Sequence, residues 1–308
     1  GKSLFTCISV SGNAVFLSGD QALQYQVGTS GAVSIGSVNG TNSIYGSSTG
    51  TLRAAMAQLA QQARPHTLEN EYNRVTKRAV DAYADISGAL TAAGTYTFDT
   101  GTTPGQFPDT GLGRQLAMVA RLIRGGQSNL GLKRQVFFVS MGGLDLHDGL
   151  IANQGRLLSQ VSDALPRFQL VMEKEGTAKN VTAFTASDFG RTLAFNGDGT
   201  DHGWGNHHFI VGGAVKGNAI YGYAPPVSIN NDRNAAGYEG HVGQGRLIPT
   251  TSVDQYGATR GKWFGLNDAQ QAEILPNLKN FGGSLTATDA GGSMTYNYPK
   301  DVGFMQPA

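Results

Sequence analysis

Residues 136–148 constrain the fold of this chain more than any other stretch. The apolar run Val136–Val139 ends near two glycines, and the residues that follow include Asp145, His147 and Asp148. A run of this kind predicts a buried parallel strand that ends where the chain turns sharply. Ligands of open α/β sheets bind beyond the carboxyl ends of the strands. These side chains therefore stand where chemistry is expected.

A second strand of the same kind is predicted at residues 181–185. It ends in an acidic turn that holds Asp188 and, three residues later, Arg191. The glycine-rich loop that follows carries His202 and leads into a further apolar segment at 209–211. Predicted helices alternate with these strands, and that order implies right-handed crossovers in a mostly parallel sheet. The sequence therefore predicts an α/β protein.

The chain divides by pattern into four regions without a clear linker or repeat. We expect strands and turns over 1–48, helices over 50–125, a core with the candidate site over 130–282, and an irregular tail over 283–308. Near the start, residues 4–10 and 14–17 flank a Ser-Gly-Asn turn, which is typical of a hairpin. Further strands are expected over 24–27 and 32–38. Periodicity and capping residues predict helices over 52–63, 67–92 (with a capping box at 67–70), 113–123, 151–165, 252–264 and 268–275. Pro166 starts or kinks a continuation of the helix over 151–165 to about residue 175.

Charge and cysteine content exclude several classes of function. Lys and Arg total 23 against 22 Asp and Glu, so no basic surplus favours nucleic acid as a partner. No run approaches the ~20 apolar residues of a membrane-spanning helix. Cys7 is the only cysteine, which rules out an intrachain disulfide and cysteine-based metal sites, and we expect it to be buried. The 44 glycines indicate many turns and site loops.

Asp145, His147, Asp188 and His202 form a donor set suited to one divalent ion. Carboxylate and imidazole together match zinc or manganese better than calcium. An ion would offset carboxylates crowded at strand ends and activate water or another oxygen nucleophile. Arg191 has two interpretations, because its guanidinium suits the oxygens of an anionic substrate and also suits a salt bridge to Asp188.

Simpler interpretations of these residues stay open. An Asp-x-His after a strand is often a turn or a helix cap, and Asp148 is well placed to cap the next helix. His207 and His208 begin a strand and point to opposite faces, so at most one faces the site. His241 is a weaker candidate, and His66, beside a proline, is expected to be structural.

Four long segments resemble the bacterial family called domain of unknown function 1501: residues 137–148, 182–193, 201–217 and 245–265. That family is thought similar to the alkaline phosphatase and sulfatase superfamily. The resemblance implies a single alkaline-phosphatase-like domain over residues 1–308, a three-layer α/β/α sandwich with a mostly parallel central sheet. It also implies export by a twin-arginine signal, to the periplasm or beyond the cell, and a chain that begins after the family's first strand.

The same resemblance assigns roles to the candidate ligands. Asp145 and His147 match one metal-binding pair of the superfamily. Asp188 matches the acidic residue of its Asp-His motif, and His202 matches its late histidine ligand. Phe189 stands where the superfamily commonly has a metal-binding histidine, which implies one ion rather than two.

These features predict an exported, metal-dependent hydrolase of phosphate or sulfate esters that acts on a small anionic ester. A second hypothesis belongs to another class: a non-catalytic surface or assembly protein that keeps the sulfatase-like fold and pairs with copies of itself. Metal content separates the two, because only the first requires a stoichiometric ion.

Overall fold

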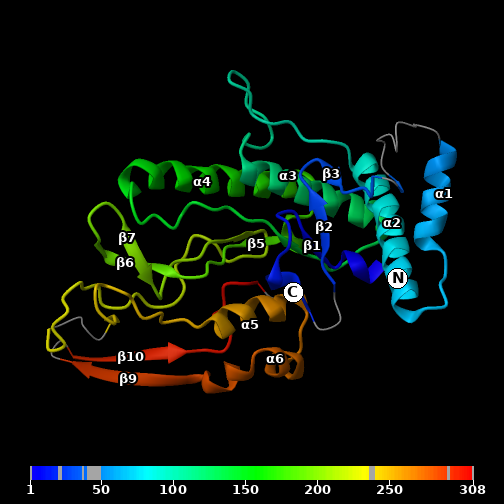
Figure 1. The fold of residues 1–308 in the computed structure, drawn as a ribbon. Helices are drawn as coiled ribbons and strands as arrows, with labels where there is room; N and C mark the ends of the chain where they lie inside the picture. Colours follow the sequence, from blue (N-terminus) through cyan, green and yellow to red (C-terminus); the bar gives the residue numbers. More distant parts are fainter. Residues whose placement is uncertain are drawn as a thin grey trace. The chain divides into compact units, whose positions relative to one another are not determined.

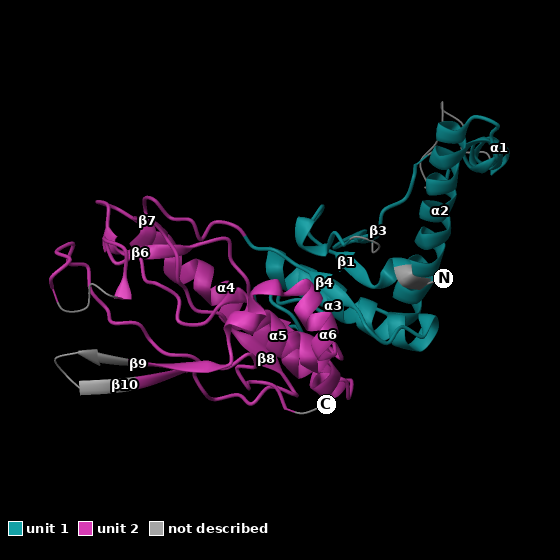
Figure 2. Ribbon diagram, turned by 90° about the horizontal axis from the view of Figure 1, so that it is seen from below, with its two compact units in different colours: residues 1–141 teal, residues 142–308 magenta. Residues whose placement is uncertain are grey.

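The computed structural model describes residues 2–19, 23–36, 38–39, 50–235, 240–289 and 292–306. The chain divides into two compact units, residues 1–141 and 142–308 (Figure 2). The single domain expected from the sequence stays a prediction. Among the described residues, no helix combines the length and the apolar character needed to cross a membrane.

A four-stranded sheet in the first unit has the order β3-β2-β1-β4. Figure 1 labels three of its strands, β1, β2 and β3. Strand β1 pairs in parallel with β2 on one side and β4 on the other, so that Ile8 lies opposite both Tyr25 and Phe137. Ile8 is fully buried, as its central place requires. Cys7 is half-buried, and burial raises the pKa of its thiol. The strands are β1 (Cys7–Ser9), β2 (Tyr25–Gly28), β3 (Gly31–Ala32) and β4 (Val136–Phe138).

The hairpin expected from residues 4–10 and 14–17 is wrong. Residues Lys2–Phe5 and Val15–Leu17 form 3-10 helices, and β1 uses both of its edges for parallel partners. A local turn signal cannot reveal a partner such as β4, which lies far along the chain. The strand expected over 32–38 is limited to Gly31–Ala32, and its residue Ser37 lies outside the described residues.

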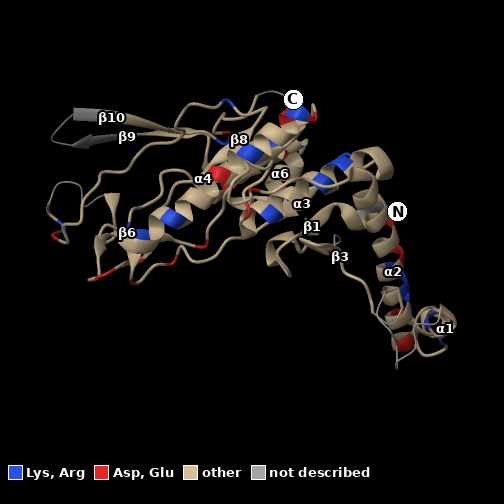
Figure 3. Cartoon of the chain, turned by 90° about the horizontal axis from the view of Figure 1, so that it is seen from above, with Lys and Arg blue, Asp and Glu red and all other residues tan. Residues whose placement is uncertain are grey.

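Helices make up most of the rest of the first unit. The side chain of Thr110 caps α3, whereas α2 begins after His66 without a side-chain cap, so the capping box expected at 67–70 is not formed. Two arginines of α3 bind the carbonyls at the end of α2: Arg121 donates to Gly94 O (2.6 Å) and Arg124 to Ala93 O (2.8 Å). The helices are α1 (Gly50–Gln61), α2 (Thr67–Ala93) and α3 (Gly111–Gly125), followed by a π-helical turn (Gly126–Leu130). Both signs of charge lie along α2 (Figure 3).

Gly125 allows α3 to approach α2 very closely. A β-carbon at this position would lie 2.5 Å from the carbonyl oxygen of Ala89, so Gly125→Ala must push the helices apart. We expect this change to lower the free energy of unfolding by about 1–3 kcal/mol, as measured by urea denaturation. Gly88→Ala is the matched control, because a β-carbon there meets nothing within 4 Å. The control should stabilise the helix by about 0.5–1 kcal/mol, and equal effects of the two changes would contradict the close approach.

Within the described part of the second unit, the strands form three antiparallel pairs: β5 with β8, β6 with β7, and β9 with β10. The hairpin of β9 and β10 replaces the irregular tail expected over 283–308, with each strand seven residues long. The elements are α4 (Leu150–Lys174), β5 (Thr182–Phe184), β6 (Gly190–Phe195), β7 (Thr200–Gly203), β8 (Ile210–Gly212), α5 (Val253–Phe264), α6 (Asp268–Ile274), β9 (Gly283–Asp289) and β10 (Gly292–Tyr298).

Helix α4 begins beside the β6–β7 turn, and Asp148 does not cap it. The residue at the cap is Gly149, which has a positive φ of 56° and no side chain to accept a hydrogen bond. Asp198 takes that role from the β6–β7 turn, since its Oδ2 accepts from Gly149 N (2.9 Å) and its carbonyl accepts from Leu150 N (3.1 Å). The start of α4 is thereby tied to the loop that precedes β7. Pro166 lies inside the helix, which continues through it to Lys174.

The C-terminal segment packs on α5 through a small apolar cluster. Phe304, Met305 and Ala214 form its buried centre, and Tyr256 and Trp263 of α5 pack against them. A capping box between Ser252 and Gln255 starts α5, close to the start that the sequence predicted for this helix.

Candidate metal centre

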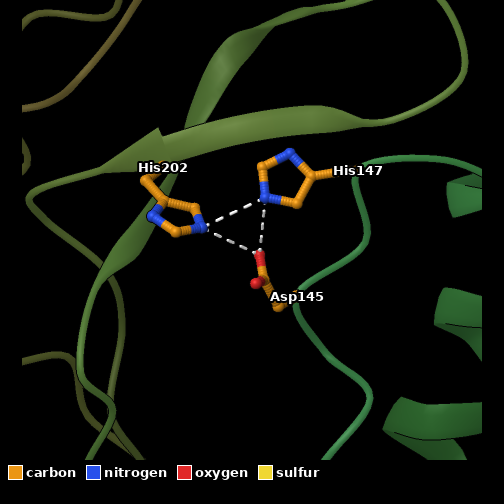
Figure 4. Close-up of side chains that lie close together, drawn as sticks. All are labelled: Asp145, His147 and His202. Carbon is orange, nitrogen blue, oxygen red and sulfur yellow. Dashed lines mark hydrogen bonds and ion pairs between the residues drawn. The ribbon is translucent and has the colours of Figure 1, made fainter.

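Three predicted ligands converge in the second unit, on two elements. Asp145 and His147 lie in the loop before α4, and His202 lies on β7. Figure 4 shows the two imidazole rings and the carboxylate turned toward one another. The two Nε2 atoms are 3.1 Å apart, and Asp145 Oδ1 lies 3.2 Å from the Nε2 of His147 and 3.1 Å from that of His202. The three side chains are about half exposed, which leaves the centre open to solutes.

The spacing of these three atoms suits a divalent ion. With bonds of about 2.0–2.1 Å, a tetrahedral ion needs ligand atoms about 3.3–3.4 Å apart, and an octahedral ion needs about 2.8–3.0 Å between neighbours. The observed separations lie between these values, so small shifts would admit either geometry. One carboxylate and two imidazoles also form the donor set that zinc and manganese accept. The residues present therefore fit an ion.

The β6–β7 turn is held against the loop of Asp145 and His147 by backbone contacts. Thr200 N donates to Leu146 O (3.1 Å). A β-carbon on Gly199 would lie 2.3 Å from the carbonyl carbon of His147, so only glycine permits this approach. This packing places His202 beside His147 although the two are 55 residues apart in the chain.

Arg191 fixes the same arrangement from β6, where it stands opposite His202 in the strand pair. Its Nε donates to Thr200 Oγ1 (2.9 Å), and its Nη2 donates to Leu146 O (2.9 Å) and to the carbonyl of Thr200. Its Nη1 donates to the carboxylate of Asp145. The side chain is only 22% exposed. Arg191 thus binds Asp145 rather than Asp188. Its guanidinium is occupied by the hydrogen bonds that hold the two segments of the site together.

Charge around Asp145 favours its ionised form. Partial desolvation pushes the pKa of its carboxyl upward, but the neighbouring His202, Arg191 and His147 outweigh that effect and leave the pKa below its usual value. An ionised carboxylate is the state in which Asp145 would bind a cation.

Asp201 supports the centre, although the sequence did not predict a role for it. Its Oδ1 lies 3.5 Å from His147 Nδ1 and accepts a hydrogen bond from Asn196 Nδ2 (2.9 Å). That hydrogen bond is the main reason why the pKa of Asp201 is lowered, with His147 adding to it against partial desolvation. A carboxylate behind an imidazole fixes the ring's orientation and raises its basicity as a ligand. The only signal in the sequence was that Asp201 directly precedes His202.

Phe189 stacks on the other ring of the centre. Its ring lies 3.8 Å from that of His202, with an angle of 18° between the planes. Phe189 stands where a second metal-binding histidine was looked for, and it packs against His202, a candidate ligand of the single proposed ion. It offers no donor atom to a second ion.

Asp188 and the remaining predicted residues lie outside this cluster. The exposed Asp188 lies beside His202 in the lining of a shallow surface hollow, but it is not among the three converging ligands. His208 stacks on Tyr256 and contacts Thr185 Oγ1 through its Nδ1 (3.3 Å), where burial lowers its pKa. His241 is buried, and its Nδ1 accepts from Gly243 N (2.9 Å). His207 is exposed on the segment before β8.

The family described as "Protein of unknown function (DUF1501)" matches residues 27–277. The chain belongs to this family. The matched range includes every residue of the candidate centre. No curated protein and no solved structure matches the chain. The family description names no activity, and the function of this DUF1501 protein has to be argued from the site.

Proposed function

We propose that this DUF1501 protein is an exported, metal-dependent hydrolase of phosphate or sulfate esters with an alkaline-phosphatase-like three-layer sandwich fold. The observation that carries the proposal is the convergence of Asp145, His147 and His202 on one point at separations of 3.1–3.2 Å. A divalent ion bound there would supply Lewis acidity and a lowered pKa for a bound water, which is the chemistry that ester hydrolysis needs.

The surrounding residues have distinct supporting roles in this proposal. Arg191 holds Asp145 in place and balances its charge, while Asp201 orients His147. Phe189 covers one face of the His202 ring and fixes its angle. Asp188 stands at the edge of the neighbouring hollow, where it can accept hydrogen bonds from a substrate. The open surroundings let an ester approach the three ligand atoms directly.

Metal content tests the proposal. The protein, purified without chelators, is expected to hold about one equivalent of zinc or manganese by elemental analysis, and His202→Ala should hold none. His207→Ala is the matched control, because His207 is an exposed histidine five residues away that is not among the three converging ligands. Wild-type protein without stoichiometric metal, even after incubation with zinc and manganese salts, would exclude the proposed hydrolase.

One observation favours a second candidate, a non-catalytic assembly protein. Strands β9 and β10 pair with each other in a two-stranded sheet, and Leu285 on β9 is 57% exposed. Unpaired strand edges are templates for pairing between chains. Metal-free protein that associates through this hairpin would favour assembly over hydrolysis.

A further inference from the structure

We propose that the hollow beside His202 binds the substrate, and that it takes a phosphate or sulfate ester whose organic part presents a flat ring. In this assignment Arg246 binds the anionic group and Trp204 packs against the ring. This inference depends on the proposed hydrolase function, because it names the substrate class and the substrate-binding residues of that same centre.

The hollow and the metal centre share one residue. The hollow has a volume of about 550 Å³ and is lined by Asp188, Phe189, His202, Gly203, Trp204, Arg246 and Pro249. His202 belongs both to this lining and to the cluster of converging ligands. A molecule held in the hollow therefore lies next to the point on which the three ligands converge.

A tight turn holds Arg246 in the hollow. Arg246 N donates to Gly243 O (3.0 Å), and Val242 N donates to Arg246 O (3.1 Å). The buried His241 accepts from Gly243 N at the base of the turn. A β-carbon on Gly245, which has a φ of +66°, would lie 2.6 Å from the Leu193 side chain, so the turn is packed closely on β6. A built turn of this kind gives the arginine a fixed place.

The turn is also tied to the chain beyond β7, which carries Trp204. Gly205 N donates to Leu247 O (3.0 Å), and Leu193 N donates to Gly245 O (3.2 Å). The first of these bonds holds the segment that carries Arg246 beside the segment that carries Trp204.

The charge of Arg246 is available to a ligand, unlike that of Arg191. Its Nη2 donates to the side-chain oxygen of Gln244, and no carboxylate among the described residues forms an ion pair with it. A planar guanidinium matches two oxygens of phosphate or sulfate at once. Arg246, rather than Arg191, is the arginine placed to bind a substrate anion.

Aromatic rings account for the other half of the assignment. Trp204 is 66% exposed at the hollow, and Phe189 adds a second aromatic side chain to the lining. An exposed indole offers a flat apolar face that favours contact with a ring. Asp188 lines the same hollow, where its carboxyl group can accept hydrogen bonds from hydroxyl groups of a ligand.

Binding of phenyl phosphate tests the inference. In a Trp263→Phe background Trp204 is the only tryptophan, and phenyl phosphate should change its fluorescence saturably. By calorimetry, Arg246→Gln should weaken the binding of phenyl phosphate, phenyl sulfate and glycerol phosphate alike, by about tenfold or more. Trp204→Ala should weaken only the two phenyl esters, by about 2–10-fold. Unchanged affinity in Arg246→Gln, or equal losses for ring-bearing and acyclic esters in Trp204→Ala, would overturn the assignment.

The same measurements separate this inference from the proposed function. They are made on chelator-treated protein, where no turnover occurs, and on His147→Ala, which breaks the ligand cluster but leaves the lining of the hollow unchanged. If phenyl phosphate binds in both states but the untreated protein holds no metal, the hollow is a ligand site and the proposed hydrolase activity is excluded. If the untreated protein holds stoichiometric metal but the chelated protein does not bind phenyl phosphate, the hollow is not the substrate site and the metal centre stands.

Discussion

Replacing Asp145 by asparagine is expected to abolish the proposed metal-dependent ester hydrolysis. The change keeps the shape of the side chain but removes the only negative charge among the three ligands, and it leaves Arg191 facing a neutral amide. Mutation of a residue that hydrogen-bonds to a metal ligand lowers metal affinity roughly 10–100-fold. Loss of a ligand itself should lower the affinity for zinc by more than that. Competition with a chromogenic chelator measures the affinity, and release of nitrophenol from nitrophenyl phosphate or sulfate measures the activity.

Asp148→Asn is the matched control for this result. Asp148 is an exposed carboxylate three residues away, outside the ligand cluster, and does not cap α4. Zinc affinity and hydrolysis should stay at the wild-type level in this variant. Equal losses in the two variants would show that negative charge near the loop, and not ligation by Asp145, determines metal binding.

Arg191→Met should both destabilise the protein and weaken metal binding. It removes the donors that join Leu146 O, Thr200 and Asp145, so that two partly buried carbonyls each lose a donor and the loop keeps only its backbone tie to β7. Loss of hydrogen bonds from a charged donor costs about 1.5–3 kcal/mol. We expect the free energy of unfolding in urea to fall by at least about 2 kcal/mol and the zinc affinity to fall about 10–100-fold. Arg191→Lys should recover little, since a single ammonium cannot span these acceptors.

The effect of Arg191→Met on stability should depend on pH. The pKa of Asp145 is lowered in the folded protein, so its contribution to stability is present above the ordinary carboxyl pKa of about 3.9 and is lost as the pH falls through the lowered value. The difference between wild type and variant should therefore be larger at pH 7 than at pH 3. A difference that is constant with pH would show that Arg191 acts only through the carbonyls.

Most of the candidate centre was predictable because its ligands follow a recognisable local pattern. Asp145 and His147 come after an apolar strand, and His202 is preceded by an acidic residue in a glycine-rich loop. Asp188 also follows an apolar strand but lies outside the cluster. The end of a strand determines where a side chain is attached but not where it points. Asp201 escaped prediction because neighbours on a strand are expected on opposite faces. Its contact with His147 depends on the β6–β7 turn.

Helices were easier to predict than strand partners. The long periodic patterns placed α2, α4 and α5 to within a few residues, since their signals are local. Partners of β1 and β5 depend on segments far along the chain, and a strand of three residues carries too little pattern to select them. The start of α4 shows the same limit, because its capping carboxylate belongs to Asp198 in a distant turn and not to the adjacent Asp148.

The pairing of His147 with His202 has a consequence for how the protein unfolds. An ion bound by both residues would close a loop of 55 residues and act as a removable cross-link on the chain. Closing a loop of that length lowers the entropy of the unfolded state, and the gain is lost when the ion leaves. The protein would then be most vulnerable to proteases wherever metal is scarce, so that metal supply would set its lifetime as well as its activity.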